Sequence, residues 1–249
     1  MSIDSEKDWR GLRRAARVAR VTLDALKARV HPGVRTAELD QVAAEVFARN
    51  NARSAPALVY GFPGTVLISV NDEIVHGIPG SRQLESGDIV KLDVTVEVGG
   101  YVADAARSVI VGAGTETARQ LVACARAAFK AALAVATAGN RVNEIGRAVE
   151  REVRRGGFSV IRGLTGHGVG RSIHEPPTVP NHYDPLQLDV LTEGLVLTIE
   201  PMISAGSDRA VEDPDGWTIR TRDGSLSAHY EDTIVITRGH PVVLTARAA

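Results

Sequence analysis

Two carboxylates lie inside one predicted hairpin of this sequence, in positions where acidic residues are uncommon. Residues 91–104 read KLDVTVEVGGYVAD, in which apolar residues alternate with polar ones around Asp93 and Asp104. The pair Gly99-Gly100 favours a two-residue type I′ turn, and the resulting register puts both acids on one face as diagonal neighbours, with backbones roughly 7–8 Å apart. Either this face is open to solvent, or the two acids are buried together and need a cation to offset their repulsion.

Three other residues could complete a site with these acids. Glu200 lies in the apolar run LVLTIEPMI, where a buried charge needs a partner, and Glu231 opens the short strand pattern EDTIVIT. His167 lies in GHGVG, where glycines allow the backbone to turn tightly. Each residue alone is more often structural. Together, four carboxylates and one imidazole suit two divalent first-row metal ions, with Mn, Fe, Co and Zn all compatible, and such ions activate water for hydrolysis.

The elements that must position these residues occur twice along the chain in the same order. Periodicities typical of amphipathic helices alternate with apolar runs typical of strands. Helices are predicted at about 7–30, 36–50, 115–138 and 143–156, and strands near 66–71, 88–111, 158–163, 194–204, 218–221 and 230–237.

The same order is visible as an internal repeat in the letters of the sequence. GVRTAEL at 33–39 matches GNRVNEI at 139–145, and LESGDIVKLDV aligns with LTEGLVLTIEP so that Asp93 falls on Glu200. Such self-similarity predicts an αα-plus-strands unit that is used twice about a pseudo-twofold axis. A site at the junction would then take equivalent residues from both halves.

Length and composition predict one catalytic domain over residues 1–249, with pseudo-repeats of about 8–112 and 113–240. The chain has 44% hydrophobic and 24% charged residues, and no linker separates the halves. A formal charge of −1 gives no strong field for nucleic acid or membrane. The single cysteine, Cys124, lies in an apolar helical pattern, which predicts a buried structural thiol and suits the cytoplasm.

Five segments resemble, in order and spacing, the successive motifs of type I methionine aminopeptidases. They are SVNDEIVHGIPG, KLDVTVEVGGYVADAARS, TGHGVGRSIHEPP, TIEPMI and DGWTIRTRDGSLSAHYEDTIVIT. The resemblance extends from about residue 8 to residue 240. It implies an α+β pita-bread fold, with two pseudo-symmetric halves around a curved antiparallel sheet. It also implies that the protein removes the N-terminal methionine when the second residue is small, with two divalent metal ions.

The resemblance assigns roles to the five candidate ligands. It implies that Asp104 and Glu231 bridge the two ions, that Asp93 chelates one of them, and that His167 and Glu200 hold the other. Glu200 would also handle the proton of the attacking water.

The resemblance also implies residues that contact the substrate. His174 would donate a hydrogen bond to the substrate carbonyl, and His76 would contact the peptide nitrogen or the leaving group. The implied walls of the methionine pocket are Phe62, Leu67, Ile173, Met202 and Trp217.

Three positions depart from the family pattern near this pocket. Val59 stands where an aromatic residue is common, Leu67 where a cysteine is common, and Ile173 where a phenylalanine is common. Such changes alter pocket shape and shift selectivity by about 1–3 kcal/mol, while the metal chemistry is unaffected.

Two alternatives remain at this point. One is a metalloaminopeptidase of the same fold with another first-residue specificity, including the Xaa-Pro type, although those relatives carry a large extra N-terminal domain. The other is a non-catalytic peptide-binding module, although such proteins lose metal ligands and all five are present. The expected partners are the N-termini of nascent polypeptides, with no nucleic acid and no membrane. We expect a monomer, and transient ribosome contact is compatible with this.

Overall fold

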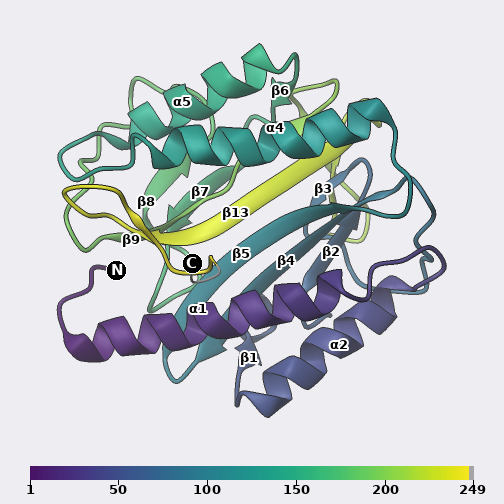
Figure 1. Ribbon diagram of the computed structural model, residues 1–249, viewed down its shortest axis with the longest axis horizontal. Helices are drawn as coiled ribbons and strands as arrows, with labels where there is room; N and C mark the ends of the chain where they lie inside the picture. Colours follow the sequence, from purple (N-terminus) through teal and green to yellow (C-terminus); the bar gives the residue numbers. More distant parts are fainter. Residues whose placement is uncertain (247–249) are drawn as a thin grey trace.

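The structure is a computed structural model that describes residues 1–246. Helices cover one face of a large antiparallel sheet (Figure 1). The helices are α1 (Glu6–Lys27), α2 (Thr36–Arg49), α3 (Ala55–Tyr60), α4 (Glu116–Leu133) and α5 (Val142–Arg155). None of these helices is both long and apolar enough to cross a membrane.

Strands from both halves of the sequence join in the main sheet, whose central order is β1-β4-β5-β13-β9-β7-β8. A smaller sheet has the order β11-β12-β3. In chain order the strands are β1 (Arg53–Ser54), β2 (Leu67–Val70), β3 (Glu73–Val75), β4 (Ile89–Val98), β5 (Tyr101–Ile110), β6 (Ser159–Val160), β7 (Thr165–Gly168), β8 (Glu175–Pro180), β9 (Val196–Ile199), β10 (Met202–Ser204), β11 (Ala210–Glu212), β12 (Ile219–Thr221), β13 (Ser227–Val235) and β14 (Val242–Val243).

The four long helices, α1, α2, α4 and α5, lie where the hydrophobic periodicity predicted helices. Helix α1 begins where the side chain of Ser5 accepts a hydrogen bond from the Asp8 N–H, which satisfies one of the free donors of the first turn. Helix α4 ends several residues earlier than predicted, with Ala134 as its C-cap, and the N–H of Ala138 bonds to the carbonyl of Thr237. The short helix α3 was not predicted, and neither were the strands β1, β3, β7, β8, β11 and β14.

The hairpin of β4 and β5 has the predicted register. Gly99 and Gly100 have φ values of 60° and 84°, the left-handed conformation that a type I′ turn requires. Val98 therefore pairs with Tyr101, and this sets the pairing of every residue down to Ile89 and Ile110. A shift of one residue would turn each carboxylate of the hairpin to the other face.

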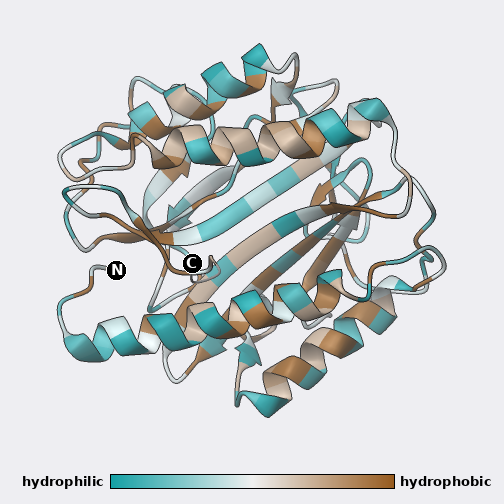
Figure 2. Ribbon diagram, viewed as in Figure 1, coloured by the Kyte–Doolittle hydropathy of each residue, from teal (hydrophilic) through white to brown (hydrophobic). Residues whose placement is uncertain are grey.

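The sheet continues from the first half into the second through the pairing of β5 with β13. Glu231 of β13 lies opposite Ala106 of β5, and Asp232 lies opposite both Ala105 of β5 and Ile199 of β9. Figure 2 shows that most of β13 is hydrophilic, whereas β2 and β4 are mainly hydrophobic. A polar strand in the middle of a buried sheet needs partners for its charges.

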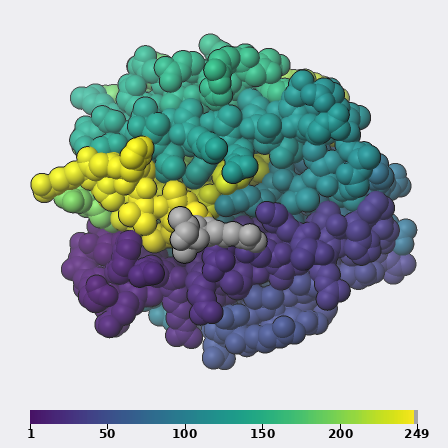
Figure 3. All heavy atoms as spheres, in the orientation of Figure 1, coloured from purple at the N-terminus to yellow at the C-terminus, as the bar shows by residue number. Residues whose placement is uncertain are grey.

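Each helix pair covers its own half of the sheet. The first hydrophobic cluster joins α1 and α2 to β4 and β5, and the second joins α4 and α5 to β9 and β13. The space-filling view shows both helix pairs closing this face, with the C-terminal segment between them (Figure 3). Cys124 is buried in the second cluster, as predicted.

Strand β3 leads into His76, whose backbone is held in an unusual conformation by the next residue. His76 has a φ of 61°, which is uncommon for a residue other than glycine. A Cβ on Gly77 would lie 2.8 Å from the Cα of Ser69 and even closer to the carbonyl of Ile68. Gly77 therefore allows the close backbone approach that fixes His76.

We expect Gly77→Ala to lower the free energy of unfolding by about 1–3 kcal/mol, because an added methyl must push β2 away from the residue 76–77 segment. Chemical denaturation measures this. Gly80→Ala is the control, since a Cβ there meets nothing within 4 Å, and it should change stability by less than about 0.5 kcal/mol. Equal stability of the two variants would contradict the close approach.

Candidate metal centre and active site

Four neighbouring strand regions bring four buried carboxylates together. Asp93 comes from β4, Asp104 from β5 and Glu231 from β13, while Glu200 follows the end of β9. All four line a single pocket and are buried, with Glu231 only 1% exposed. The face of the hairpin that carries both aspartates is therefore not open to solvent, and the alternative of exposed acids is wrong.

The crowded acids resist ionisation. Burial, then the charge of Asp104, raises the pKa of Asp93 well above its usual value, and the same two causes raise the pKa of Glu200. The pKa of Glu231 is also raised by burial and by its neighbours, Asp104 first. Burial raises the pKa of Asp104 to about 6, although a hydrogen bond from Thr95 opposes the shift. Divalent cations between these groups would remove the cost of ionising them.

Unused lone pairs in the cluster fit bound cations. Within the described residues, Asp93 Oδ1 and Glu231 Oε1 are buried without a hydrogen-bond partner, and buried oxygens in folded proteins are rarely left so. Hydroxyl donors orient two other acids: Thr95 donates to Asp104 over 2.9 Å, and Thr198 donates to Glu200 over 2.8 Å. The acids are held in place while other oxygens remain free to bind a metal.

His167 joins the cluster in the form that a metal ligand requires. Its Nδ1 lies 2.9 Å from the carbonyl oxygen of Gly168, which can only accept, so Nδ1 carries the proton. Its Nε2 is 3.4 Å from Glu200 Oε1. One ligand atom from each of Asp104, His167 and Glu231 lies within 4.8 Å of the others. The five predicted ligand residues thus converge in one place.

His229 is a further histidine at the cluster, and it is not one of the five predicted ligands. It is 1% exposed, and one ligand atom from each of Asp93, His229 and Glu231 lies within 4.8 Å of the others. Burial, then the nearby charge of Lys91, lowers the pKa of His229 to about 3, so the imidazole is neutral. Its position two residues before Glu231, on the same face of β13, is the feature that could have identified it.

The pocket above the cluster has a volume of about 650 Å³ and a largely apolar wall. All five predicted wall residues line it, and the rings of Phe62 and Trp217 meet edge to face with centroids 5.2 Å apart. Pro56, Tyr60 and Val75 also line it and were not predicted. Val59 is 56% exposed and is not among the lining residues, so its departure from the family pattern does not reshape the wall.

Two histidines lie beside the cluster, as predicted. His76 and His174 both line the pocket, and the rings of His167 and His174 have centroids 4.2 Å apart. Burial, then the charge of His174, lowers the pKa of His76 to about 4, and burial lowers the pKa of His174. Tyr60 fixes His174 through a 2.6 Å hydrogen bond to Nδ1.

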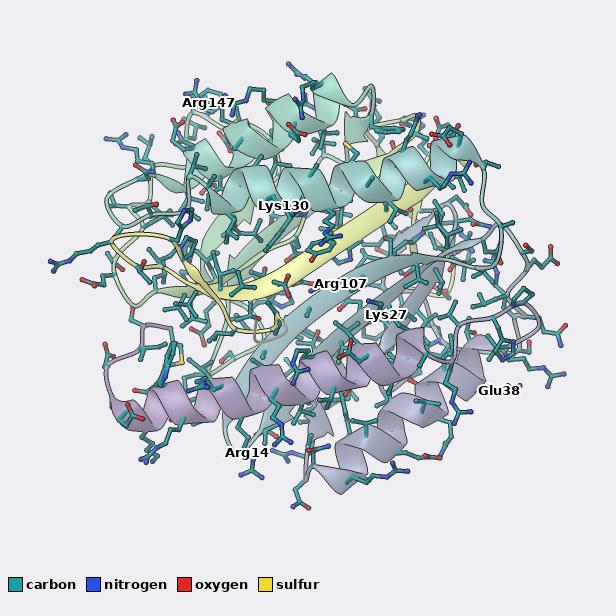
Figure 4. All side chains as sticks on the ribbon, viewed as in Figure 1. Arg14, Lys27, Glu38, Arg107, Lys130 and Arg147 are labelled. Atoms are coloured by element: carbon teal, nitrogen blue, oxygen red, sulfur yellow. The ribbon has the colours of Figure 1, made fainter. Side chains whose placement is uncertain are left out.

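The face of β5 and β13 opposite the acid cluster carries an ion pair between Arg107 and Asp232. Arg107 bonds both carboxylate oxygens of Asp232, at 2.8 and 3.0 Å, and also donates to the backbone carbonyl of Glu231. In Figure 4, Arg107 lies between Lys27 and Lys130, on the face that the helices cover. The bidentate pair holds the two strands together directly behind the acid cluster.

The sequence of this chain is similar to those of known metallopeptidases. The model of metallopeptidase family M24 matches residues 10–238. Methionine aminopeptidase 2 of Bacillus subtilis is 42% identical over 98% of this chain and 99% of its own length, and a methionine aminopeptidase of Clostridium perfringens is 42% identical over 94% of each.

Solved structures agree with the sequence matches. The crystal structure of methionine aminopeptidase from Thermotoga maritima superposes with a TM-score of 0.95 at 34% identity, over 99% of this chain and all of that one. Prolidase from Pyrococcus furiosus shares the fold, with a TM-score of 0.77 at 22% identity, although this chain covers only 66% of it. The expected pita-bread fold is confirmed, and the chain belongs to metallopeptidase family M24, within its methionine aminopeptidases.

Proposed function

We propose that this protein removes the N-terminal methionine from nascent proteins and peptides whose second residue is small, by metal-dependent hydrolysis of the first peptide bond. The observation that carries the proposal is the convergence of four buried carboxylates and the Nε2 of His167 at the floor of an apolar-walled pocket. Relatives named methionine aminopeptidase, at 42% identity over nearly the whole chain, support the substrate class.

The proposed site holds two divalent ions, among Co, Mn, Fe(II) and Zn. Asp93, Asp104 and Glu231 would hold one, while His167 and Glu200 would hold the other, with Asp104 and Glu231 shared between them. Bound ions would supply Lewis acidity, which polarises a carbonyl and makes water a nucleophile near neutral pH. The unpartnered oxygens of Asp93 and Glu231 support this assignment.

Residues of the chain itself would bind and orient the substrate and would move protons. Glu200 would accept the proton of the attacking water, and Thr198 holds its carboxylate in place. When Tyr60 donates its hydroxyl proton to His174 Nδ1, His174 Nε2–H is free to donate to the substrate carbonyl and to the oxyanion that follows. His76 would contact the peptide nitrogen or the leaving group.

The apolar wall would select the first side chain. Phe62, Leu67, Ile173, Met202 and Trp217 line the pocket and offer no charge to a polar side chain. A long, flexible thioether fits such a pocket, whereas a charged side chain would lose its hydration without a partner. Aminopeptidase activity on another small apolar first residue is the second candidate, because Leu67 and Ile173 do line the wall.

The setting of the reaction is also part of the proposal. We place a single catalytic domain, residues 1–249, in the cytoplasm, acting on nascent N-termini with transient ribosome contact. The absence of any paired cysteine suits a reducing compartment. One chain carries every residue of the site, so a monomer would suffice.

Release of the first residue from X-Ala-Ser peptides tests the specificity. We expect X = Met to exceed X = Val or Leu by about tenfold or more in kcat/KM, because the pocket discriminates by shape. Chromatography of the released residue, with each metal added in turn, measures this. A preference for another small apolar X would refute the methionine claim and leave the hydrolytic chemistry standing.

We expect Asp104→Asn to lower kcat on Met-Ala-Ser by about a thousandfold, because the shared carboxylate is lost and several kcal/mol of charge stabilisation go with it. Steady-state kinetics with saturating metal measures this. Asp208→Asn is the control, since Asp208 pairs with Arg162 at the surface, and its activity should be unchanged. Full turnover by Asp104→Asn would refute the assignment of the site.

A further inference from the structure

The imidazole of His229 is buried with both of its ring nitrogens unsatisfied. Neither Nδ1 nor Nε2 has a hydrogen-bond partner in the part of the chain that the structure describes, and the residue is 1% exposed. A neutral imidazole has one donor and one acceptor, and buried polar groups of native proteins almost always find partners. Both ring nitrogens are therefore available to a partner outside the protein chain.

The ring points into the acid cluster. His229 Nε2 lies 3.6 Å from Glu231 Oε2 and 3.9 Å from Glu200 Oε2. These distances are too long for a hydrogen bond. They match the roughly 3–4 Å that separates two donor atoms bound to one metal ion at about 2.1 Å each.

The backbone of His229 is fixed from both sides, so the ring has a defined position. Ser108 Oγ accepts from the His229 N–H over 2.8 Å and donates to the His229 carbonyl over 2.9 Å. On the other side, the residue pairs with Met202 of β10. A donor held this rigidly on a strand is suited to metal binding, which needs precise placement.

We propose that His229 is a sixth metal ligand, which donates through Nε2 to the ion that Asp93 and Glu231 would hold. The inference rests on the proposed metal-dependent function and deepens it. With His229, each of the two positions would have one nitrogen donor, His167 at one and His229 at the other. Imidazole suits Zn, Fe and Co, whereas an all-carboxylate position suits Mg and Mn. His229 would therefore bias this position away from Mn.

Proton NMR of the full-length protein loaded with Co(II) counts the coordinated imidazoles. A histidine bound to paramagnetic Co(II) through Nε2 gives a strongly shifted Nδ1–H resonance that disappears in D₂O. We expect two such resonances in the wild-type protein, from His167 and His229, and one in His229→Gln. Glutamine keeps a polar amide near the position of Nε2, and His229→Asn is a second variant in case the first does not fold.

Calorimetric metal titration provides the second measurement. We expect His229→Gln to weaken binding of one Co(II) equivalent by about 10- to 100-fold, with a smaller loss for Mn(II). His182→Gln is the matched control: its Nδ1 is also buried without a partner, but it lies in a different pocket, with Glu150 and Asp208. This control should keep both resonances and both affinities.

The outcomes separate this inference from the proposed function. One shifted imidazole resonance in the metal-loaded wild-type protein would overturn the role of His229, whatever the variants do. Unchanged Co(II) affinity in a folded His229→Gln protein would overturn it as well. A wild-type protein that binds no divalent ion at all would instead overturn the proposed function on which the inference rests.

Discussion

Four buried carboxylates repel one another at the centre of the sheet, and the rest of the structure depends on how this repulsion is offset. Burial raises the pKa of Asp93, Asp104, Glu200 and Glu231, and neighbouring carboxylates raise it further for Asp93, Glu200 and Glu231. Such a cluster without cations would bind protons or force the strands apart. The hydroxyl donors and the imidazole of His167 help to orient the acids. Among the described residues, however, no lysine or arginine forms an ion pair with any of the four.

The rest of the sheet is arranged to keep these acids in place. The Gly99-Gly100 turn fixes the register of β4 and β5, and the Arg107–Asp232 pair joins β5 to β13 from behind. Two separate hydrophobic clusters anchor the halves, so the acids lie where independently packed layers meet. Because each half is rigid, charged groups can be held at the junction between the two halves. A bound ion can contact carboxylates from both halves there.

The sequence could predict the parts of the site that obey local rules. A two-residue turn has one favoured geometry, so the shared face of Asp93 and Asp104 followed from counting along two strands. Glu200 and Glu231 followed from charges in apolar runs. Tyr60 could not be found in this way, because its contact with His174 joins residues far apart in sequence through the unpredicted helix α3. The exposure of Val59 depends on the same helix. His229 is intermediate: its spacing from Glu231 is local, but its burial against β10 is not.

The resemblance assigned roles that no local rule supplies, above all which carboxylates would bridge the two ions. The central claim is that paired divalent cations offset the charge of the acid cluster. Calorimetric titration of the metal-free protein with Co(II), followed by thermal unfolding, tests it most directly. We predict two equivalents bound per chain and an unfolding temperature that rises with metal concentration, because ions that bind the folded state stabilise it. A titration without heat, together with an unfolding temperature that metal does not change, would contradict the account.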